Sequence, residues 1–233
     1  NLGKYLPADF ETAVGIMDQI VMNYGSWLDN YAGFFPGFVE LYGRDEANWD
    51  ISMAALARYT QYASSEFAVR WFIINHEERM MKQMYAWSKD ENECIRRLAS
   101  EGCRPALPWG QALTGFKKDP APILPILRQL KADSSLHVRK SVANNLNDIS
   151  KTHPNLVMEL AKDWYGKNAY TDWIVKHGCR TLLKKGSSEV LALFGYECAP
   201  SVEVQDFRLG ETAISIGEDV TFSFEILAEE ASK

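Results

Sequence analysis

Apolar residues in this chain recur with the three- and four-residue spacing of an α-helix as far as about Phe194. Helix-start signals accompany this pattern. Asp9 is placed to cap the first helix, and Asp119 precedes prolines that fall in or near a first turn, where a missing N–H group costs little. The pattern predicts helices at 9–21, 50–62 and 66–74, a long helix that follows the third through 87, and one that begins after Asp119. Further helices are predicted within 135–154 and at 154–164, 171–184 and 187–194.

After Gly195 the period changes from 3.6 to 2, which is typical of half-buried β-strands. The expected strands are 201–207, 213–216 and 220–226. Three strands are too few for a stable sandwich, so this segment is either the opening of a β-sandwich domain or a small β tail. We therefore expect a mostly α protein with a helical domain over 1–195 and a β segment over 196–233.

The helix expected within 135–154 carries the most informative polar pattern. Its apolar residues share one face: Val138, Val142, Leu146 and Ile149. Its short polar residues share a flank: Ser141, Asn144, Asn145 and Asp148. An ordinary solvated face carries Lys and Glu pairs instead, so this flank is expected where another polymer backbone comes close. Asp148 is the leading candidate for a site residue.

Basic residues recur at a spacing that suggests a repeat. Arg97, Arg139 and Lys176 follow one another at intervals of 42 and 37 residues, close to the roughly 40–47-residue period of HEAT-type helical pairs. The interval from Arg70 to Arg97 is too short for that period, so the repeat is degenerate. Stacked pairs would build an array with one concave face. The alternative is that these are ordinary surface residues of amphipathic helices.

Composition limits the functions that are open to the chain. Its 233 residues can hold one extended domain, or one domain and part of another. The formal charge of −6 argues against a protein that coats nucleic acid nonspecifically, since most of that affinity comes from phosphate neutralisation. The four cysteines have no metal-site spacing and are expected to be buried, reduced thiols. We expect no metal and no membrane span, and the first residue, Asn and not Met, suggests a fragment of a longer protein.

Residues 101–110 form a loop stiffened by two prolines, which would present Trp109 rigidly beside Arg104. The indole could stack on a sugar or base, or attract a cationic group to its face. A buried tryptophan that only packs is the alternative.

Several motifs resemble the AlkC branch of the AlkC/AlkD bacterial DNA alkylation-repair glycosylases. They are Glu101-Gly-x-Arg-Pro-x-Leu-Pro-Trp109, Pro122-Ile-Leu-Pro-Ile-Leu127 and Val138-Arg-Lys-Ser-Val-Ala-Asn-Asn-Leu-Asn-Asp-Ile149. They occur in the expected order, and the likeness covers most of 50–195. It continues into 202–209 and 216–224, which look like the first strands of the immunoglobulin-like domain of some members.

The resemblance implies a HEAT-like α-solenoid, followed by a short, truncated immunoglobulin-like segment, that grips duplex DNA. The implied activity is excision of positively charged N-alkylated bases, without base flipping, in base excision repair. The implied lesions are 3-methylcytosine, 1-methyladenine and 3-methyladenine. No cofactor is expected, and the protein would act as a monomer in the cytoplasm, at the bacterial nucleoid.

Residue roles follow from the same motifs. Asp148 matches the acidic catalytic residue, and Glu66 matches a second acidic site residue. Arg97 and Trp109 match residues on the lesion side of the cleft, and Arg180 lies where another is expected. A carboxylate near C1′ would stabilise the cationic sugar that forms when an alkylated base leaves. The expected DNA-binding residues are Arg70, Arg97, Arg104, Trp109, Arg139, Lys140, Lys176 and Arg180.

Two other functions remain open. One is a related array that binds DNA structures but has lost excision activity, and the other is a protein-binding helical scaffold. The presence of both Asp148 and Glu66 favours the enzyme over the first, and Trp109 with its neighbouring arginines favours DNA over the second.

Overall fold

The computed structural model describes residues 2–24, 33–196 and 202–228, and the chain divides into two compact units. The first unit is Asn1–Lys185 and is helical; the second is Gly186–Lys233 and contains the β-strands. This division falls ten residues before the predicted domain boundary, so the last helix belongs to the second unit. Cys198 and Ser201, which the sequence patterns included, lie outside the described residues.

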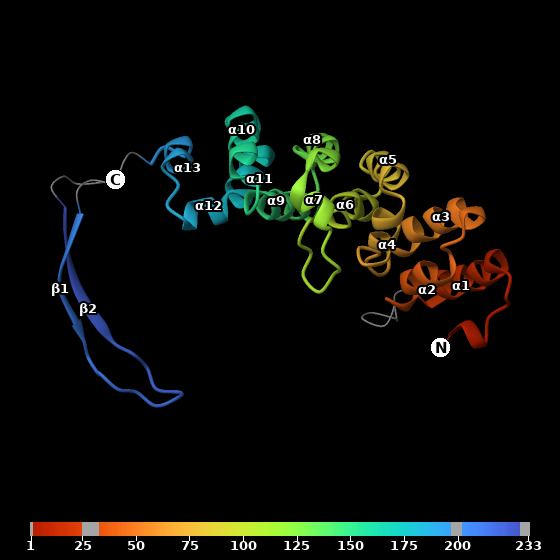
Figure 1. Ribbon diagram of the computed structural model, residues 1–233, viewed down its shortest axis with the longest axis horizontal. Coiled ribbons are helices and arrows are strands. Elements are labelled where there is room, and N and C mark those ends of the chain that lie inside the picture. Colours follow the sequence, from red (N-terminus) through yellow and green to blue (C-terminus); the bar gives the residue numbers. More distant parts are fainter. Residues whose placement is uncertain (1, 25–32, 197–201, 229–233) are drawn as a thin grey trace. The chain divides into compact units, whose positions relative to one another are not determined.

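The elements of the first unit follow one another with short connections (Figure 1). Its helices are α1 (Phe10–Tyr24), α2 (Phe34–Tyr42), α3 (Trp49–Tyr59), α4 (Ala68–Asn75), α5 (Glu77–Trp87), α6 (Glu93–Glu101), α7 (Thr114–Lys118), α8 (Leu124–Leu130), α9 (Leu136–Ser150), α10 (Pro154–Trp164), α11 (Ala169–Gly178) and α12 (Arg180–Lys184). Short 3-10 turns lie at Leu2–Lys4, Glu46–Asn48 and Ala121–Ile123.

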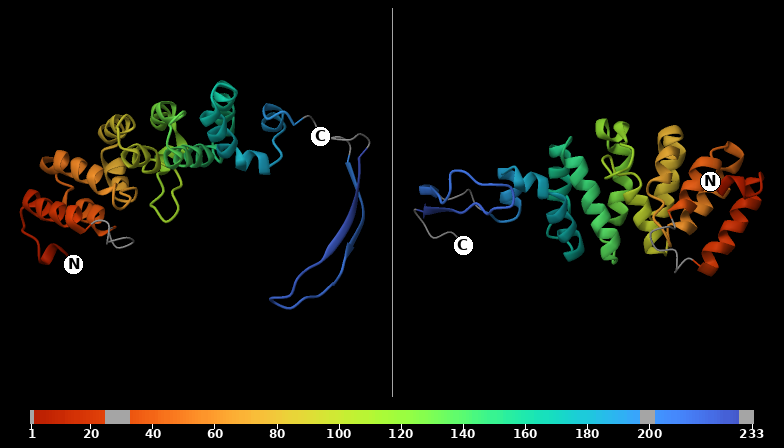
Figure 2. Two further views of the ribbon diagram at one scale, coloured as in Figure 1. Left: turned by 180° about the vertical axis from the view of Figure 1, so that it is seen from behind. Right: turned by 90° about the horizontal axis from the view of Figure 1, so that it is seen from below.

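Within this unit the helices pack as consecutive pairs. The pair α5 and α6 is followed by α8 with α9 and then by α10 with α11, and α9 also packs against α6 and α11. Figure 1 shows α4, α6 and α9 in one row and α5, α8 and α10 in the other, and Figure 2 shows the helices side by side. This is the predicted HEAT-like arrangement. The 42- and 37-residue intervals separate α6, α9 and α11, which are neighbours in space.

Local signals explain several helix ends. Asp9 caps α1 as predicted, since its Oδ2 atom accepts a hydrogen bond from the Thr12 backbone N–H at 2.9 Å. The bounds of α10 agree with the prediction, with Pro154 at its first position. The apolar face predicted for α9 is buried in full: Val138, Val142, Leu146 and Ile149.

The run predicted at 66–74 and the helix predicted to follow it through Trp87 are present as α4 and α5. They are separated at His76, whose backbone leaves helical geometry (φ −138°, ψ 49°) and whose ring lies 5.6 Å from Trp49 and 5.7 Å from Trp71. The predicted helix 171–184 breaks at Cys179, because the Asn147 side chain accepts a hydrogen bond from the Thr181 N–H and caps a new helix there. The prediction of one continuous helix over 171–184 was wrong.

The second unit contains α13 (Ser188–Leu193) and an antiparallel hairpin of β1 (Val202–Leu209) and β2 (Phe222–Ala228). Val204 pairs with Ile226, and an irregularity between Gln205 and Arg208 places Asp206 at φ 53°. The strand predicted at 213–216 was wrong, because 211–221 form the loop of this hairpin. The hairpin exposes a row of aromatic and aliphatic side chains: Val204, Phe207, Phe222, Phe224 and Ile226.

No helix in the described part of the chain is long and apolar enough to cross a lipid bilayer.

Candidate active site

Asp148 lies in the last turn of α9 and is buried, with 3% of its surface exposed. Both carboxylate oxygens have cationic partners. Arg104 Nε donates to Oδ2 at 2.9 Å, and Lys151 Nζ donates to Oδ1 at 3.0 Å. Arg104 is also buried, whereas the Lys151 side chain is 48% exposed. Buried Arg104 therefore holds the carboxylate from the interior, and Lys151, with its flexible side chain, covers it from the solvent.

Glu66 immediately precedes α4 and is fixed by Arg97 of α6. Arg97 Nη1 lies 2.8 Å from Glu66 Oε2, and the Ser64 hydroxyl donates to the same oxygen at 2.6 Å. Arg97 Nη1 also donates to Ser64 Oγ at 3.1 Å. This carboxylate is oriented by neutral and charged donors together.

A third carboxylate connects these two sites. Glu101, at the end of α6, accepts from Arg104 Nη1 at 2.7 Å and lies 3.8 Å from Arg97 Nη2. Burial alone lowers the pKa of Arg104, but Glu101 and Asp148 outweigh it and raise the pKa overall. The result is a continuous series of alternating charges, which we call the acid–base chain: Glu66, Arg97, Glu101, Arg104, Asp148 and Lys151.

The polar flank of α9 is largely a helix–helix contact. Asn145 is fully buried, and its Nδ2 atom donates to the Ser100 carbonyl of α6 at 2.9 Å. Ser141 is buried as well. Of the four residues of the flank, only Asn144 is partly exposed. Short polar side chains here let two helices approach closely, and the expectation that the whole flank meets another polymer was wrong.

Arg180 of α12 joins the Asp148 end of the site. Its Nη2 atom donates to Asn144 Oδ1 at 3.1 Å and its Nη1 atom to the His177 carbonyl at 3.0 Å. Burial lowers the pKa of Arg180, while the charge of Asp148 acts in the opposite direction. The structure thus brings together sequence-predicted residues from the segment before α4, from α6 and the loop after it, and from α9 and α12: Glu66, Arg97, Arg104, Asp148 and Arg180.

Trp109 lies in the loop between α6 and α7, and its side chain is 99% exposed. Its backbone adopts φ 60°, in the left-handed region that L-residues other than Asn and Asp rarely enter. Figure 1 shows this loop projecting away from the row of α5, α8 and α10. The tryptophan is presented to solvent, which excludes the alternative of a buried packing role.

The remaining predicted DNA-binding residues lie in three different settings. Arg70 of α4 is only 1% exposed, and its side chain donates to carbonyls of the loop that carries Trp109. Arg139 donates to the Asp133 and Ser134 carbonyls at the start of α9, and its guanidinium lies 4.1 Å from the Tyr170 ring centre. Lys140 and Lys176 are exposed. The structure does not bring Arg139 to the acid–base chain.

Sequence reasoning missed two members of the site, Glu101 and Lys151. The signal for both was present, because Glu101 and Arg104 are three positions apart, as are Asp148 and Lys151. Charges at that spacing on a helix face each other. Glu101 entered the sequence patterns only as part of a motif.

A surface hollow of about 360 Å³ adjoins Arg97. It is lined by Thr60, Gln61, Tyr62, Ala63, Ser64, Cys94, Arg97 and His137. Burial, and then the neighbouring Arg97, lower the pKa of His137. Within residues 2–24, 33–196 and 202–228, no group of three or more His, Cys, Asp or Glu side chains could hold a metal ion.

Comparison with known proteins places this chain in a family. Residues 46–182, which include every member of the acid–base chain, match the family described as DNA alkylation repair enzyme. The chain belongs to that family. The sequence is 54% identical over 199 residues to YhaZ of Bacillus subtilis (strain 168), an uncharacterized protein, and this match covers 85% of the chain and 55% of YhaZ.

A solved structure of a DNA complex shares the fold of this DNA alkylation repair family member. It is the Pseudomonas fluorescens alkylpurine DNA glycosylase AlkC bound to DNA containing an abasic site analog. The TM-score is 0.77 at 39% sequence identity, over 96% of this chain and 60% of AlkC. The chain thus spans little more than half the length of the relatives it matches.

Proposed function

We propose that this protein is a DNA glycosylase that removes positively charged N-alkylated bases from duplex DNA in base excision repair. The observation that carries the proposal is the burial of Asp148 between two cations at one end of a chain of ion pairs that has Glu66 at the other. Family membership and the likeness to AlkC on DNA support it. The proposed lesions are 3-methylcytosine, 1-methyladenine and 3-methyladenine.

Excision of an alkylated base requires an anion near the sugar more than it requires an acid that protonates the base. Alkylation places a positive charge on the base, so the C1′–N bond can break with its electron pair leaving on the base, which becomes neutral. The sugar becomes an oxocarbenium-like cation, and water adds to C1′ and loses a proton. A fixed carboxylate beside C1′ lowers the energy of that cation. We assign this role to Asp148, with Glu66 as a second anion in the same field.

The cations of the site would act on DNA and on the carboxylates. Arg97 and Arg104 hold Glu66 and Asp148 in place, and the exposed Lys140 and Lys176 would neutralise phosphates. Because the catalytic groups act on the sugar, the base need not leave the helix, and we propose excision without base flipping. Trp109, exposed on its loop, would contact the DNA at the lesion.

Release of methylated bases from methylated duplex DNA, measured by chromatography and mass spectrometry with purified protein, tests this proposal. We expect release of 3-methyladenine, 1-methyladenine and 3-methylcytosine, and little release of uracil from a matched duplex, since a neutral base is a poor leaving group without a general acid. Tight DNA binding with no base release would favour the inactive DNA-binding relative instead. We also propose that the protein is a monomer, which a sizing column would show, and that it acts in the cytoplasm.

A further inference from the structure

Arg70 is among the most deeply buried large side chains of the described residues, yet it is a cation. It lies in α4, and burial lowers its pKa to about 10, so it remains charged at neutral pH. A buried arginine adds little to the free energy of unfolding, because the cost of removing its charge from water is about as large as the gain from its contacts. Stability alone therefore does not account for the buried position of Arg70.

Within the described residues, all the hydrogen bonds of the Arg70 side chain go to one loop. Its Nε atom donates to the Gln111 carbonyl at 2.5 Å, and its Nη1 atom donates to the carbonyls of Gly102 at 2.9 Å and Arg104 at 3.0 Å. Gly102 and Arg104 begin the connection between α6 and α7, and Gln111 is near its end. One rigid guanidinium thus joins the two ends of the loop.

The loop is closely fitted around this clamp. A Cβ atom on Gly102 would lie 2.5 Å from Val69 Cγ2, so the backbone can approach α4 only because the residue is glycine. Within the loop, the Gly110 N–H donates to the Leu107 carbonyl at 3.1 Å, and the Leu107 side chain is buried. These contacts leave Trp109 at the tip with a defined direction.

Both ends of the clamp connect to the candidate site. On one side Arg104 continues from the clamped carbonyl to Asp148, 2.9 Å away. On the other side the loop carries the exposed Trp109. We infer that Arg70 is a positioning residue, which holds the loop as a rigid arm so that the Trp109 indole meets the DNA in a fixed pose and Arg104 stays on Asp148. This inference rests on the proposed function and changes the predicted role of Arg70 from DNA binding to clamping of the loop.

The test compares Arg70→Lys with Trp109→Ala and with the double variant, in binding to duplex DNA that contains an abasic-site analog. A lysine keeps the charge but cannot reach three carbonyls on both sides of the loop. Base–aromatic stacking corresponds to roughly tenfold or more in affinity, and we expect each single variant to lose about that much. If Arg70 acts through Trp109, the double variant binds as tightly as Trp109→Ala alone.

Arg96→Lys is the matched control. Arg96, in α6, also binds two carbonyls, those of Asp90 and Glu91, and the Asp133 carboxylate, but these partners lie outside the loop between α6 and α7. We expect this control to lower thermal stability without changing DNA affinity. Should Arg70→Lys fail to fold, Arg70→Gln repeats the comparison without leaving a buried cation unpaired.

Hydrogen exchange of residues 102–113 provides a readout that needs no DNA. We expect faster exchange of this loop in Arg70→Lys and unchanged exchange in Arg96→Lys. The inference would be overturned if the loop of Arg70→Lys exchanged as slowly as that of the wild-type protein. It would also be overturned if the fold-loss of affinity in the double variant equalled the product of the losses in the two single variants. If the wild-type protein binds no DNA, the proposed function fails, while the exchange measurement still decides whether Arg70 clamps the loop.

Discussion

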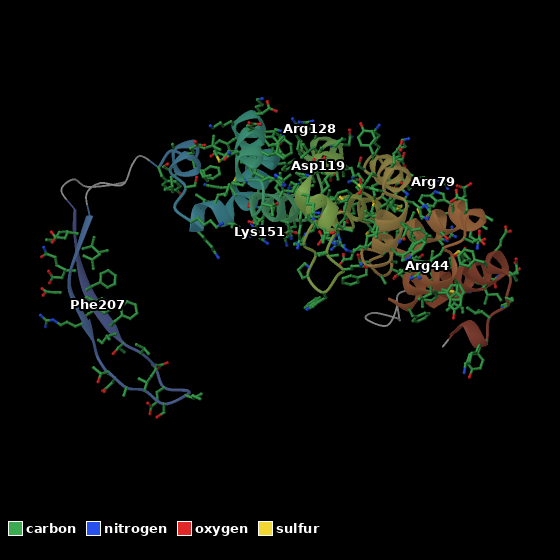
Figure 3. The ribbon with its side chains drawn as sticks, in the orientation of Figure 1. Arg44, Arg79, Asp119, Arg128, Lys151 and Phe207 are labelled. Carbon is green, nitrogen blue, oxygen red and sulfur yellow. The ribbon has the colours of Figure 1, made fainter. Side chains whose placement is uncertain are left out.

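Lys151 Nζ lies 3.0 Å from Asp148 Oδ1, and the two residues are three positions apart at the end of α9. The Asp148 side chain is buried, whereas that of Lys151 is half exposed. In Figure 3, Lys151 lies along the row of α6 and α9, whereas Arg128 lies in the row of α8. The carboxylate that we assign to the chemistry is thus covered by a flexible cation, which a DNA phosphate could draw away.

We predict that Lys151→Met weakens DNA binding without slowing base release at saturating protein. The substitution removes a phosphate contact, which should lower the slope of log affinity against log salt by roughly 0.9. It also removes a cation that competes with the sugar for Asp148. Single-turnover kinetics and a salt titration measure the two effects. Lys167→Met, which breaks an exposed pair with Asp163, is the matched control, and a much lower saturating rate for Lys151→Met would assign Lys151 to the chemistry itself.

Asp148→Asn should reduce single-turnover base release by roughly 10²–10³-fold, the loss typical when transition-state electrostatics are removed. Arg104 keeps Glu101 as a partner in the variant, so we expect the protein to fold and to bind DNA. Asp163→Asn removes an exposed carboxylate of α10 and should leave the rate unchanged. Full activity of Asp148→Asn would remove this carboxylate from the mechanism.

DNA affinity should rise as the pH falls below about 6.5. Burial lowers the pKa of His137 and of His177, and the charges of Arg97 and Arg180 lower them further, so both imidazoles are neutral at pH 7 in the free protein. A nearby phosphate favours the protonated form, so binding takes up protons. Affinities at pH 8 and pH 6, at constant ionic strength, measure this effect. A His137→Gln, His177→Gln variant that retains the full pH dependence would contradict it.

The same histidines give an opposite prediction for stability. Their pKa values are lower in the folded state than in the unfolded chain, so the unfolded chain binds more protons as the pH falls below about 6.5. The free energy of unfolding of the free protein should therefore decrease in that range. Denaturant titrations at pH 8 and pH 6 measure it, and the double glutamine variant should show a smaller decrease.

Cys103 and Cys179 should resist thiol reagents in the folded protein. Burial raises the pKa of Cys103 to about 12 and that of Cys179 to about 11, so almost no thiolate forms at pH 8. Mass spectrometry after treatment with an alkylating reagent, with and without denaturant, checks this. The prediction also separates two repair chemistries, because transfer of a methyl group from DNA to either thiol would increase the protein mass, whereas base release would not. A mass increase at Cys103 or Cys179 after incubation with methylated DNA would contradict the glycosylase assignment.

The sequence predicted what depends on local chemistry and on periodicity. The Asp9 cap, the buried face of α9 and the spacing of α6, α9 and α11 all follow from residues close in the chain or from a regular repeat. Breaks set by distant residues could not be predicted in this way. The helix ends at Cys179 because the Asn147 side chain, more than thirty positions earlier, caps the next one.

Among polar residues, sequence reasoning identified the charged types of the site but not which way they face. Asn145 looked like part of a binding flank and instead bonds a carbonyl of α6. Arg70 looked like a surface cation and instead is buried in α4, where its side chain binds the carbonyls of a loop. In both cases the hydrogen-bond partner is a backbone carbonyl far along the chain. A carbonyl is present at every residue and leaves no mark in the sequence, so periodicity cannot reveal such a contact.

Trp109 is a bulky residue in a left-handed backbone conformation with its whole ring in water. That conformation costs on the order of 1 kcal/mol for an L-residue, and glycine would adopt it freely. Glycine at this position would therefore give a more stable fold than tryptophan does. A population of variants selected only for heat resistance should discard the tryptophan early, whereas one selected for survival under alkylating agents should keep it. The residue found at position 109 would then show whether a lineage has been selected for heat resistance or for survival under alkylating agents.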